Sequence, residues 1–218
     1  MFTRFFDLSQ PIFHNCPAWP TYQMTTVEME AVCANNGFTA ERISLNSHTA
    51  THLDAPYHFF PEGKKIDEIP VERFQGTAVL VDLRGVVAAA EGITSEHLKP
   101  YADLITKDTI VLLNTGWYAK RSYSNEYYHD WPYITADAAE WLKDRGVKGV
   151  GIDGLSIGGW YEGTGRPCHE ILLANEIWAL EEVYFPEELM ESKTCYLMAF
   201  PLKLQGFSGA PVRVVAAL

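Results

Sequence analysis

The sequence predicts a mixed α/β fold in a single domain, and three observations support this. The chain has 218 residues, a length that suits one well-buried domain and is short for two. No internal repeat or linker divides it. Buried runs of apolar and β-branched residues are separated by capped, helix-like segments. Because hydrophobic residues make up 47% and charged residues 21%, as in ordinary globular proteins, we expect one domain over residues 1–218.

The strands are predicted from composition and turn signals, in chain order. Two β-like runs in residues 25–45 flank Asn36-Gly37, a strong tight-turn signal, so a hairpin is expected there. The remaining predicted strands, all rich in apolar or β-branched residues, are 77–83, 108–114, 148–153, 194–204 and 211–217.

Two helices and one long loop are expected between these strands. Thr94 or Ser95 can cap a short helix that Pro100 ends, and Thr135 can cap a second helix that Gly146 stops. The tyrosine-rich residues 118–133 show no clear period. We therefore expect a loop there, of the length that usually forms a lid or an oligomer contact.

Charge and composition exclude several functional classes. The net charge of −11, with no basic stripe, argues against a nucleic-acid partner. No apolar run approaches the roughly 20 residues that cross a bilayer, and the N-terminus lacks signal-peptide features. The four cysteines are widely scattered and are expected to be reduced. The prediction is a cytoplasmic protein without nucleic-acid or membrane partners.

Residues 47–59 carry the strongest functional signal, because His48, His52, Asp54 and His58 lie within eleven residues. Imidazole and carboxylate are the usual ligands of zinc or manganese. A straight strand would place His48 and Asp54 about 20 Å apart, and a helix would turn Asp54 away and be disrupted by Pro56. We therefore expect a strand that ends near His48, followed by a compact bent segment. A polar loop whose histidines satisfy backbone groups is the alternative, and the crowding disfavours it.

Three other features remain open on the residues alone. Trp19 stands between Pro17 and Pro20, so it is either a lid over the core or an aromatic wall for a ligand. In one straight helix His169 and Glu181 would lie about 18 Å apart, so they share a metal only if the segment doubles back. The glycine-rich residues 158–165 lack the lysine and spacing of a phosphate loop.

The stretch His48-Thr-Ala-Thr-His52-Leu-Asp54-Ala-Pro56-Tyr-His58-Phe59 resembles the signature of the metal-dependent cyclase-like hydrolases, the family of bacterial kynurenine formamidase and isatin hydrolase. The resemblance extends over most of the chain. Asp7-Leu-Ser-Gln-Pro and Ala18-Trp19-Pro20 are similar to that family's N-terminal arm, and Gly209-Ala-Pro-Val-Arg213 is similar to its C-terminal strand. The central motif is specific, and the flanking ones support it.

The resemblance implies a mixed β/α fold of the swivelling β/β/α type, with flanking helices around a barrel-like central sheet. It implies that His58 transfers protons and that Trp19 and Phe59 border the substrate, Trp19 within one chain or across a dimer interface. The metal ligands that it implies, for one or two Zn²⁺ or Mn²⁺ ions, are His48, His52, Asp54, His169 and Glu181. Ala50 stands where many members have glycine, and Glu182 replaces a common asparagine, which leaves open whether Glu181 or Glu182 binds metal.

The expected activity is hydrolysis of an amide, formamide or cyclic imide-like C–N bond of a small aromatic substrate, with metal-activated water as the nucleophile. His58 would act as general base and acid. The rivals are an isatin-type, lactone or ester hydrolase, a ring-closing cyclase, and a metal-dependent binding protein. A purely structural metal is disfavoured, because such sites normally close with four protein ligands. A homodimer or homotetramer is expected.

Overall fold

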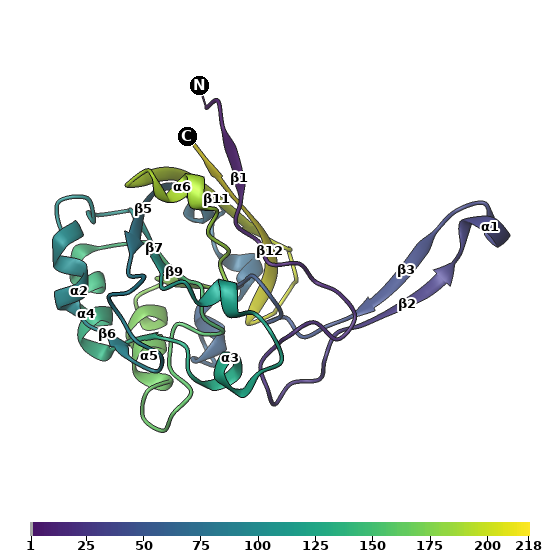
Figure 1. The fold of residues 1–218 in the computed structure, drawn as a ribbon, viewed down its shortest axis with the longest axis horizontal. Coiled ribbons are helices and arrows are strands. Elements are labelled where there is room, and N and C mark those ends of the chain that lie inside the picture. The colour runs from purple at the N-terminus through teal and green to yellow at the C-terminus, as the bar shows by residue number, and fades with distance from the viewer. Residues whose placement is uncertain (1) are drawn as a thin grey trace.

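The computed structural model describes residues 2–218, and its centre is a barrel-like sheet of seven strands (Figure 1). The ring closes because the short strand β4 pairs with β10 on one side and β12 on the other, while β1 adds to the outer edge of β12. The predicted barrel-like sheet with flanking helices is confirmed. The sheet strands are β1 (Phe5–Asp7), β4 (His52–Asp54), β5 (Gln75–Asp82), β7 (Ile110–Asn114), β9 (Gly149–Ile152), β10 (Trp178–Glu181), β11 (Thr194–Pro201) and β12 (Gly209–Ala217).

Strands β5, β7, β9 and β10 run parallel, and both of their faces are buried. Val79 and Val81 of β5 pack under the helices, whereas Ala78 and Leu80 point into the barrel. This explains the continuous apolar runs, because a parallel strand is covered on both sides. Figure 1 shows the outer cover, formed by α2 (Ser95–Leu98), α4 (Ala136–Arg145) and α5 (Arg166–Ala174). Thr135 caps α4 as predicted, since its hydroxyl accepts a hydrogen bond from the Ala138 N–H.

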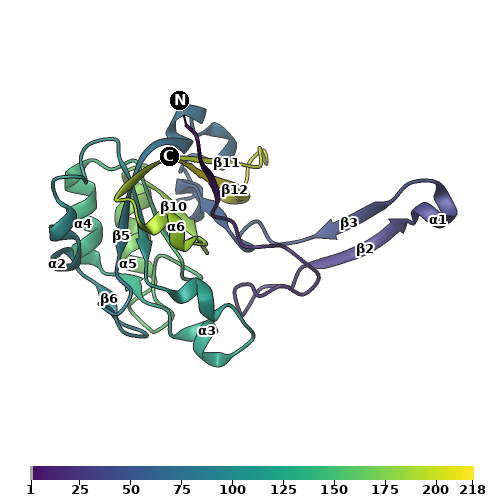
Figure 2. The ribbon, with the colours of Figure 1, turned by 45° about the horizontal axis from the view of Figure 1, so that its top comes forward.

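The predicted hairpin is confirmed, and it projects from the body of the molecule (Figures 1 and 2). It consists of β2 (Thr26–Ala31) and β3 (Ala40–Ser44). A helical turn, α1 (Cys33–Asn36), joins them in place of a two-residue turn, and Gly37 ends it with a left-handed φ of 79°. Asn36-Gly37 therefore marks the end of a helical turn.

The prediction of an irregular loop over residues 118–133 is only partly right. Two short helices lie there, η5 (Trp117–Lys120) and α3 (Asn125–His129), because the Ser124 hydroxyl accepts a hydrogen bond from the Tyr127 N–H and caps the second. The other short elements are η1 (Pro56–His58), η2 (Ile66–Glu68), η3 (Val71–Phe74), β6 (Gly92–Ile93), η4 (Lys99–Tyr101), β8 (Tyr133–Ile134) and α6 (Glu187–Met190).

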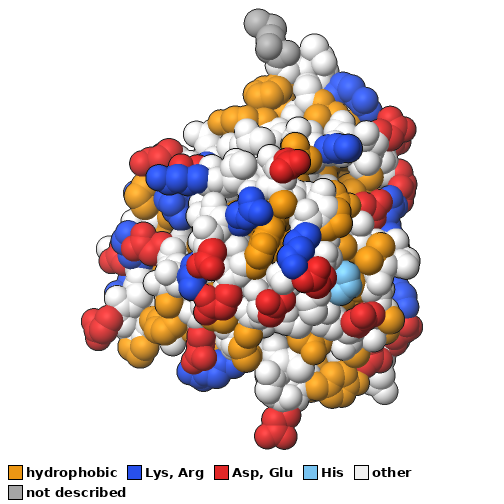
Figure 3. Space-filling view, turned by 90° about the vertical axis from the view of Figure 1, so that its left-hand side faces the viewer, with side chains coloured by type: hydrophobic (Ala, Val, Ile, Leu, Met, Phe, Trp, Pro, Cys, Tyr) orange, Lys and Arg blue, Asp and Glu red, His pale blue; other side chains and the backbone are white. Residues whose placement is uncertain are grey.

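The charge of the surface and the lengths of the helices bear on nucleic-acid and membrane partners. On the face in Figure 3, Lys and Arg side chains are interspersed with Asp and Glu and form no continuous stripe. Within residues 2–218 no helix combines the length and the hydrophobicity that crossing a bilayer requires.

Candidate metal centre

Strand β4 and the bend before it bring the motif residues together. Ala50 adopts a left-handed φ of 53°, and the chain turns there so that His48 lies beside Asp54, with 2.7 Å between Nδ1 and Oδ1. The expected strand ends before His48, at Ser44, and a bend follows it as predicted, but the prediction missed the short strand β4 beyond the bend. His52 and Asp54 lie on β4, and η1 then carries His58.

His169 and Glu181 join this group because the chain doubles back between them. His169 lies on α5, and β10 returns antiparallel to β4 so that Glu181 pairs in register with His52. The His52 Nε2 atom lies 3.2 Å from Glu181 Oε2, and the His169 Nε2 atom lies 3.3 Å from Glu181 Oε1 and 3.8 Å from Asp54 Oδ2. The sequence analysis required this segment to double back if His169 and Glu181 were to share a metal, and the structure shows that it does.

Asp54 occupies the middle of the cluster and belongs to two possible ligand sets. One set is His48, Asp54 and His58, and the other is His52, Asp54 and Glu181. Within each set the ligand atoms lie within 4.8 Å of one another. Asp54 could therefore contribute to either ligand set.

Backbone carbonyls orient two of the histidines toward this centre. The Nδ1 atom of His52 lies 2.8 Å from the Ala50 carbonyl oxygen, and that of His169 lies 2.7 Å from the Gly165 carbonyl oxygen. A carbonyl only accepts, so each Nδ1 carries the proton and each Nε2 presents a lone pair to the centre. The glycine-rich loop thus supplies a carbonyl that positions His169.

Two serines that the sequence analysis did not identify hold side chains of the cluster in place. Ser208 Oγ lies 2.8 Å from His48 Nε2, while the Ser156 hydroxyl and the Ile157 N–H donate to Glu181 Oε1. Ser156 follows the end of a buried parallel strand, a place where ligand sites often form, and that signal could have identified it. Gly209 permits the close packing of His48, because a Cβ there would lie 2.8 Å from His48 Cε1.

Two buried atoms show whether the cluster suits a metal ion. His52 Nε2 and Asp54 Oδ2 make no hydrogen bond to any group of residues 2–218. Leaving buried acceptors unpaired is costly, and a cation held by these two atoms would remove that cost. The donor set therefore fits a divalent metal ion.

The cluster holds its carboxylates ionised. Burial alone would raise the pKa of Asp54, but the charges of His58 and His48 hold it well below its usual value. For Glu181, burial and the nearby Asp54 would raise the pKa, but the imidazoles of His169 and His52 beside its oxygens lower it to about 2. Burial lowers the pKa of His58 despite the opposing attraction of Asp54.

A cavity of about 560 Å³ opens over these residues. Its aromatic lining consists of Trp19, Tyr22, Phe59 and Trp160. Phe59 stacks on His169 with ring centroids 4.6 Å apart, and Trp19 packs against Trp160 at 5.3 Å and Trp131 at 5.7 Å. Trp19 thus covers the core and lines the cavity within one chain, so both roles left open for it are compatible.

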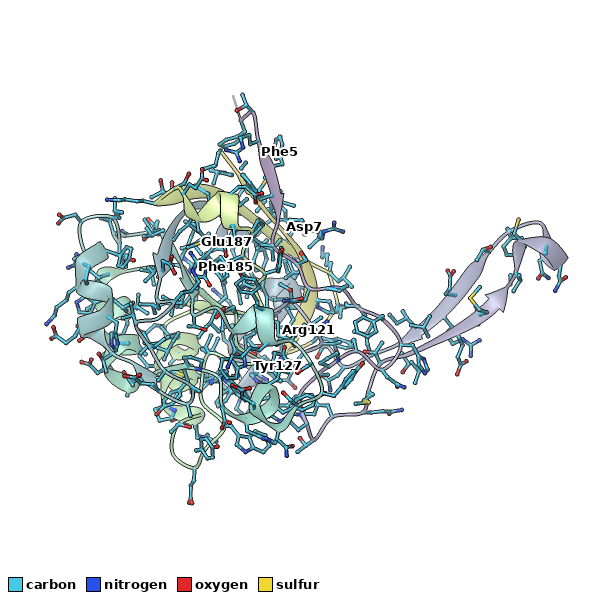
Figure 4. All side chains as sticks on the ribbon, in the orientation of Figure 1. Phe5, Asp7, Arg121, Tyr127, Phe185 and Glu187 are labelled. Carbon is cyan, nitrogen blue, oxygen red and sulfur yellow. The ribbon has the colours of Figure 1, made fainter. Side chains whose placement is uncertain are left out.

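Glu182 also lines the cavity, but it is paired away from the candidate ligands. Its Oε2 atom accepts hydrogen bonds from Arg121 Nε at 3.1 Å and the Tyr127 hydroxyl at 3.2 Å. Figure 4 shows Arg121 and Tyr127 near each other, both on the segment that includes η5 and α3. The structure thus places Glu181, and not Glu182, among the possible metal ligands.

Comparison with known proteins supports a shared fold. A family model described as a putative cyclase matches residues 6–158. Kynurenine formamidases of Bacillus thuringiensis (strain Al Hakam) and Bacillus anthracis are 28% and 27% identical over 218 residues, covering 98% of this chain and 97% of each relative. Isatin hydrolase A from Labrenzia aggregata, solved with benzyl benzoate, superposes with a TM-score of 0.88 at 25% identity over 99% of this chain and 93% of that one. A structure described as a potential metal-dependent hydrolase with cyclase activity gives 0.81 at 27% identity, covering 98% and 97%.

Proposed function

This chain belongs to the cyclase family and is a metal-dependent hydrolase, and we propose that it cleaves the C–N bond of a small aromatic amide, best exemplified by an aryl formamide. One observation carries the proposal: the unpaired atoms His52 Nε2 and Asp54 Oδ2 lie at a cluster of imidazoles and carboxylates beside an aromatic cavity. The similarity to kynurenine formamidases supports the amide substrate.

The cluster would hold one or two divalent cations, Zn²⁺ or Mn²⁺, through His48, His52, Asp54, His169 and Glu181. Bound there, such an ion supplies polarisation of a carbonyl oxygen and activation of water. The Ala50 and Gly165 carbonyls fix the two imidazoles, so the ligand atoms need little reorganisation. The Oδ1 atom of Asp54 lies beside His48 and its Oδ2 atom near His58 and His169, so Asp54 would contribute to either ligand set.

His58 is the proposed proton carrier. Its Nε2 atom lies 4.0 Å from Asp54 Oδ2, and at 24% its side chain is more exposed than those of His48 and His52. A neutral imidazole at the cavity wall can accept a proton from water at Nε2 and deliver it to the leaving nitrogen. No serine or thiol nucleophile is needed for this chemistry.

The cavity supports a small aromatic substrate. A volume of about 560 Å³ lies in the range of small-molecule sites. Phe59 is already held flat against His169, and Trp19 is fixed by two other tryptophans. These preordered rings would contact an aromatic substrate and exclude water from the cleaved bond.

A hydrolysis assay with metal removal tests the proposal. We expect cleavage of N-formylkynurenine by the purified protein, loss of activity after chelation, and recovery with added Zn²⁺ or Mn²⁺. Cleavage of isatin or of aryl esters without cleavage of formamides would favour the second candidate, an isatin-type or ester hydrolase, which the superposition on isatin hydrolase A supports. Tight ligand binding without turnover would indicate a binding protein instead.

A further inference from the structure

The turn between β11 and β12 forms part of the wall of the candidate metal centre. The Ser208 carbonyl accepts a hydrogen bond from the Ala55 N–H at 2.8 Å, and the Phe207 carbonyl accepts one from the Ile66 N–H at 3.0 Å. These bonds tie the turn to the segment that follows β4 and fix the backbone at Ser208. The Ser208 hydroxyl is thereby placed at His48, although 160 residues separate the two in the chain.

The imidazole of His48 is held at both of its nitrogens. Its Nε2 atom lies 2.8 Å from Ser208 Oγ, and its Nδ1 atom lies 2.7 Å from Asp54 Oδ1. Within residues 2–218, Ser208 is the group that forms a hydrogen bond with this Nε2 atom. Gly209 allows the close approach, because a Cβ there would lie 2.5 Å from the Leu53 carbonyl oxygen as well as too near the ring of His48. The orientation of the ring is therefore fixed by its neighbours.

His48 is oriented in the opposite sense to two other histidines of the cluster. His52 and His169 turn Nδ1 to a backbone carbonyl and Nε2 to the centre. His48 instead turns Nδ1 to Asp54 and Nε2 to Ser208. A cation that His48 shares with Asp54 would therefore meet Nδ1. Such a bond needs the lone pair of Nδ1, so the single proton of the neutral ring has to be on Nε2.

A serine hydroxyl suits this arrangement because its oxygen can accept the Nε2 proton. The partner of the second ring nitrogen fixes the tautomer and the orientation of a metal-binding histidine. For His52 and His169 that partner is a backbone carbonyl, which a substitution of its own side chain does not remove. For His48 it is the side chain of Ser208, so a single substitution can delete it.

We propose that Ser208 is a positioning residue of the metal centre: its hydroxyl accepts the Nε2 proton of His48 and keeps the Nδ1 lone pair directed at the cation. The proposal rests on the proposed function, because it needs a metal ion at the cluster. Ser208 acts on the ligand set that contains His48, and among residues 2–218 it forms no side-chain hydrogen bond with His52 or Glu181 of the other set. Its removal should therefore weaken one ligand set and spare the other.

The test measures Zn²⁺ binding to the metal-free protein by calorimetry, and the protonation of the His48 nitrogens in the Zn²⁺-loaded protein by NMR of nitrogen-labelled imidazoles. In the unmodified protein we expect His48 to bind through Nδ1 and to carry its proton on Nε2. Ser208→Ala should weaken Zn²⁺ binding at the His48 ligand set by roughly ten- to hundredfold, and Ser208→Thr, which keeps a hydroxyl, should retain the affinity. Unchanged Zn²⁺ affinity in Ser208→Ala, or a His48 that binds Zn²⁺ through Nε2, overturns the proposal.

A matched control separates this role from a general loss of stability. Ser44→Ala makes the same change at an exposed position of β3 in the projecting hairpin, and it should keep both the Zn²⁺ affinity and the NMR signals of His48. If Ser208→Ala does not fold, the ring nitrogen through which His48 binds Zn²⁺ in the unmodified protein still decides the proposal. An unmodified protein that binds neither Zn²⁺ nor Mn²⁺ contradicts the proposed function as well, whereas full Zn²⁺ affinity in a folded Ser208→Ala variant contradicts the role of Ser208 alone.

Discussion

His58 differs from the other residues of its motif in being partly open to the cavity. Replacing it by alanine removes the proton carrier but leaves His48, His52, Asp54, His169 and Glu181 in place. We expect kcat to fall by roughly a hundred- to ten-thousandfold, with bound metal unchanged by elemental analysis. Loss of metal together with activity would instead identify His58 as a ligand, consistent with its place in one of the two ligand sets.

Ala50 adopts a conformation that favours glycine. We expect Ala50→Gly to raise the free energy of unfolding by about 0.5–1 kcal/mol, because relief of the left-handed strain exceeds the entropy that glycine adds to the unfolded chain. The control is Ala55→Gly, at an ordinary φ of −97°, which should lower stability. Urea unfolding of both variants measures the difference. An equal loss of unfolding free energy in the two variants would show that Ala50 is not strained.

Single residues were predictable where the signal was local. His48, His52, Asp54 and His58 could be identified because they crowd into a few positions, whereas His169 and Glu181 depended on a family resemblance. Ser208 was not found, because it meets His48 across 160 residues of chain. The pairing of Glu182 with Arg121 spans 61 residues, and no spacing in the sequence indicates it.

At the scale of elements, Asp153 links the end of β9 to the turn that starts η5. Its oxygens accept hydrogen bonds from the Thr115 N–H and hydroxyl and from the Tyr118 N–H. Burial exceeds the effect of these bonds and raises the pKa of Asp153 to about 6 from 3.8. The folded protein therefore keeps this proton to higher pH than the unfolded chain does.

The sign of the pH effect follows from that difference. Well below pH 3.8 the group is protonated in both states, and between about pH 3.8 and 6 the unfolded chain has lost its proton while the folded protein keeps it. Stability relative to Asp153→Asn should therefore fall by about 3 kcal/mol over this range and stay constant above it. Urea unfolding of both metal-free proteins from pH 3 to 8 measures the difference, and a constant difference would contradict the raised pKa.

Elements with strong local patterns were predicted well. The buried strands β5, β7, β9, β11 and β12 lie within a few residues of the predicted ranges, because long apolar runs and flanking turns are local signals. Strand β4 was not predicted, since it has three residues and exists through pairing with β10 and β12. Closure of the sheet depends on that non-local pairing, so it could be inferred only from the family resemblance.

For the whole molecule, the projecting hairpin suggests self-association. Strands β2 and β3 contact chiefly each other, and Met29, Val32, Phe38 and Ile43 are between 43% and 60% exposed on the hairpin or its tip. A two-stranded hairpin is at best marginally stable alone, and exposed apolar side chains favour association. We therefore propose that a second copy of the chain covers the hairpin in a homodimer or homotetramer.

A shortened hairpin tests this proposal. Thr26 and Ser44 are paired in register, so an Asn-Gly turn can replace residues 27–43 without moving the body of the molecule. By sedimentation equilibrium we expect the full chain to be a dimer or tetramer and the shortened chain to be a monomer. A full chain that is monomeric, or a shortened chain that still associates, would contradict it.

The most direct test of the metal-dependent hydrolase is the metal content and the N-formylkynurenine activity of the same samples, for the unmodified protein, Glu181→Ala and the control Glu187→Gln. We predict two metal equivalents in the unmodified protein and the control, falling to one or none in Glu181→Ala with loss of hydrolysis, because Glu181 joins His52 and His169 at the centre. A single metal equivalent per chain that stays unchanged in Glu181→Ala, with hydrolysis retained, would contradict a metal-dependent hydrolase in which Glu181 is a ligand.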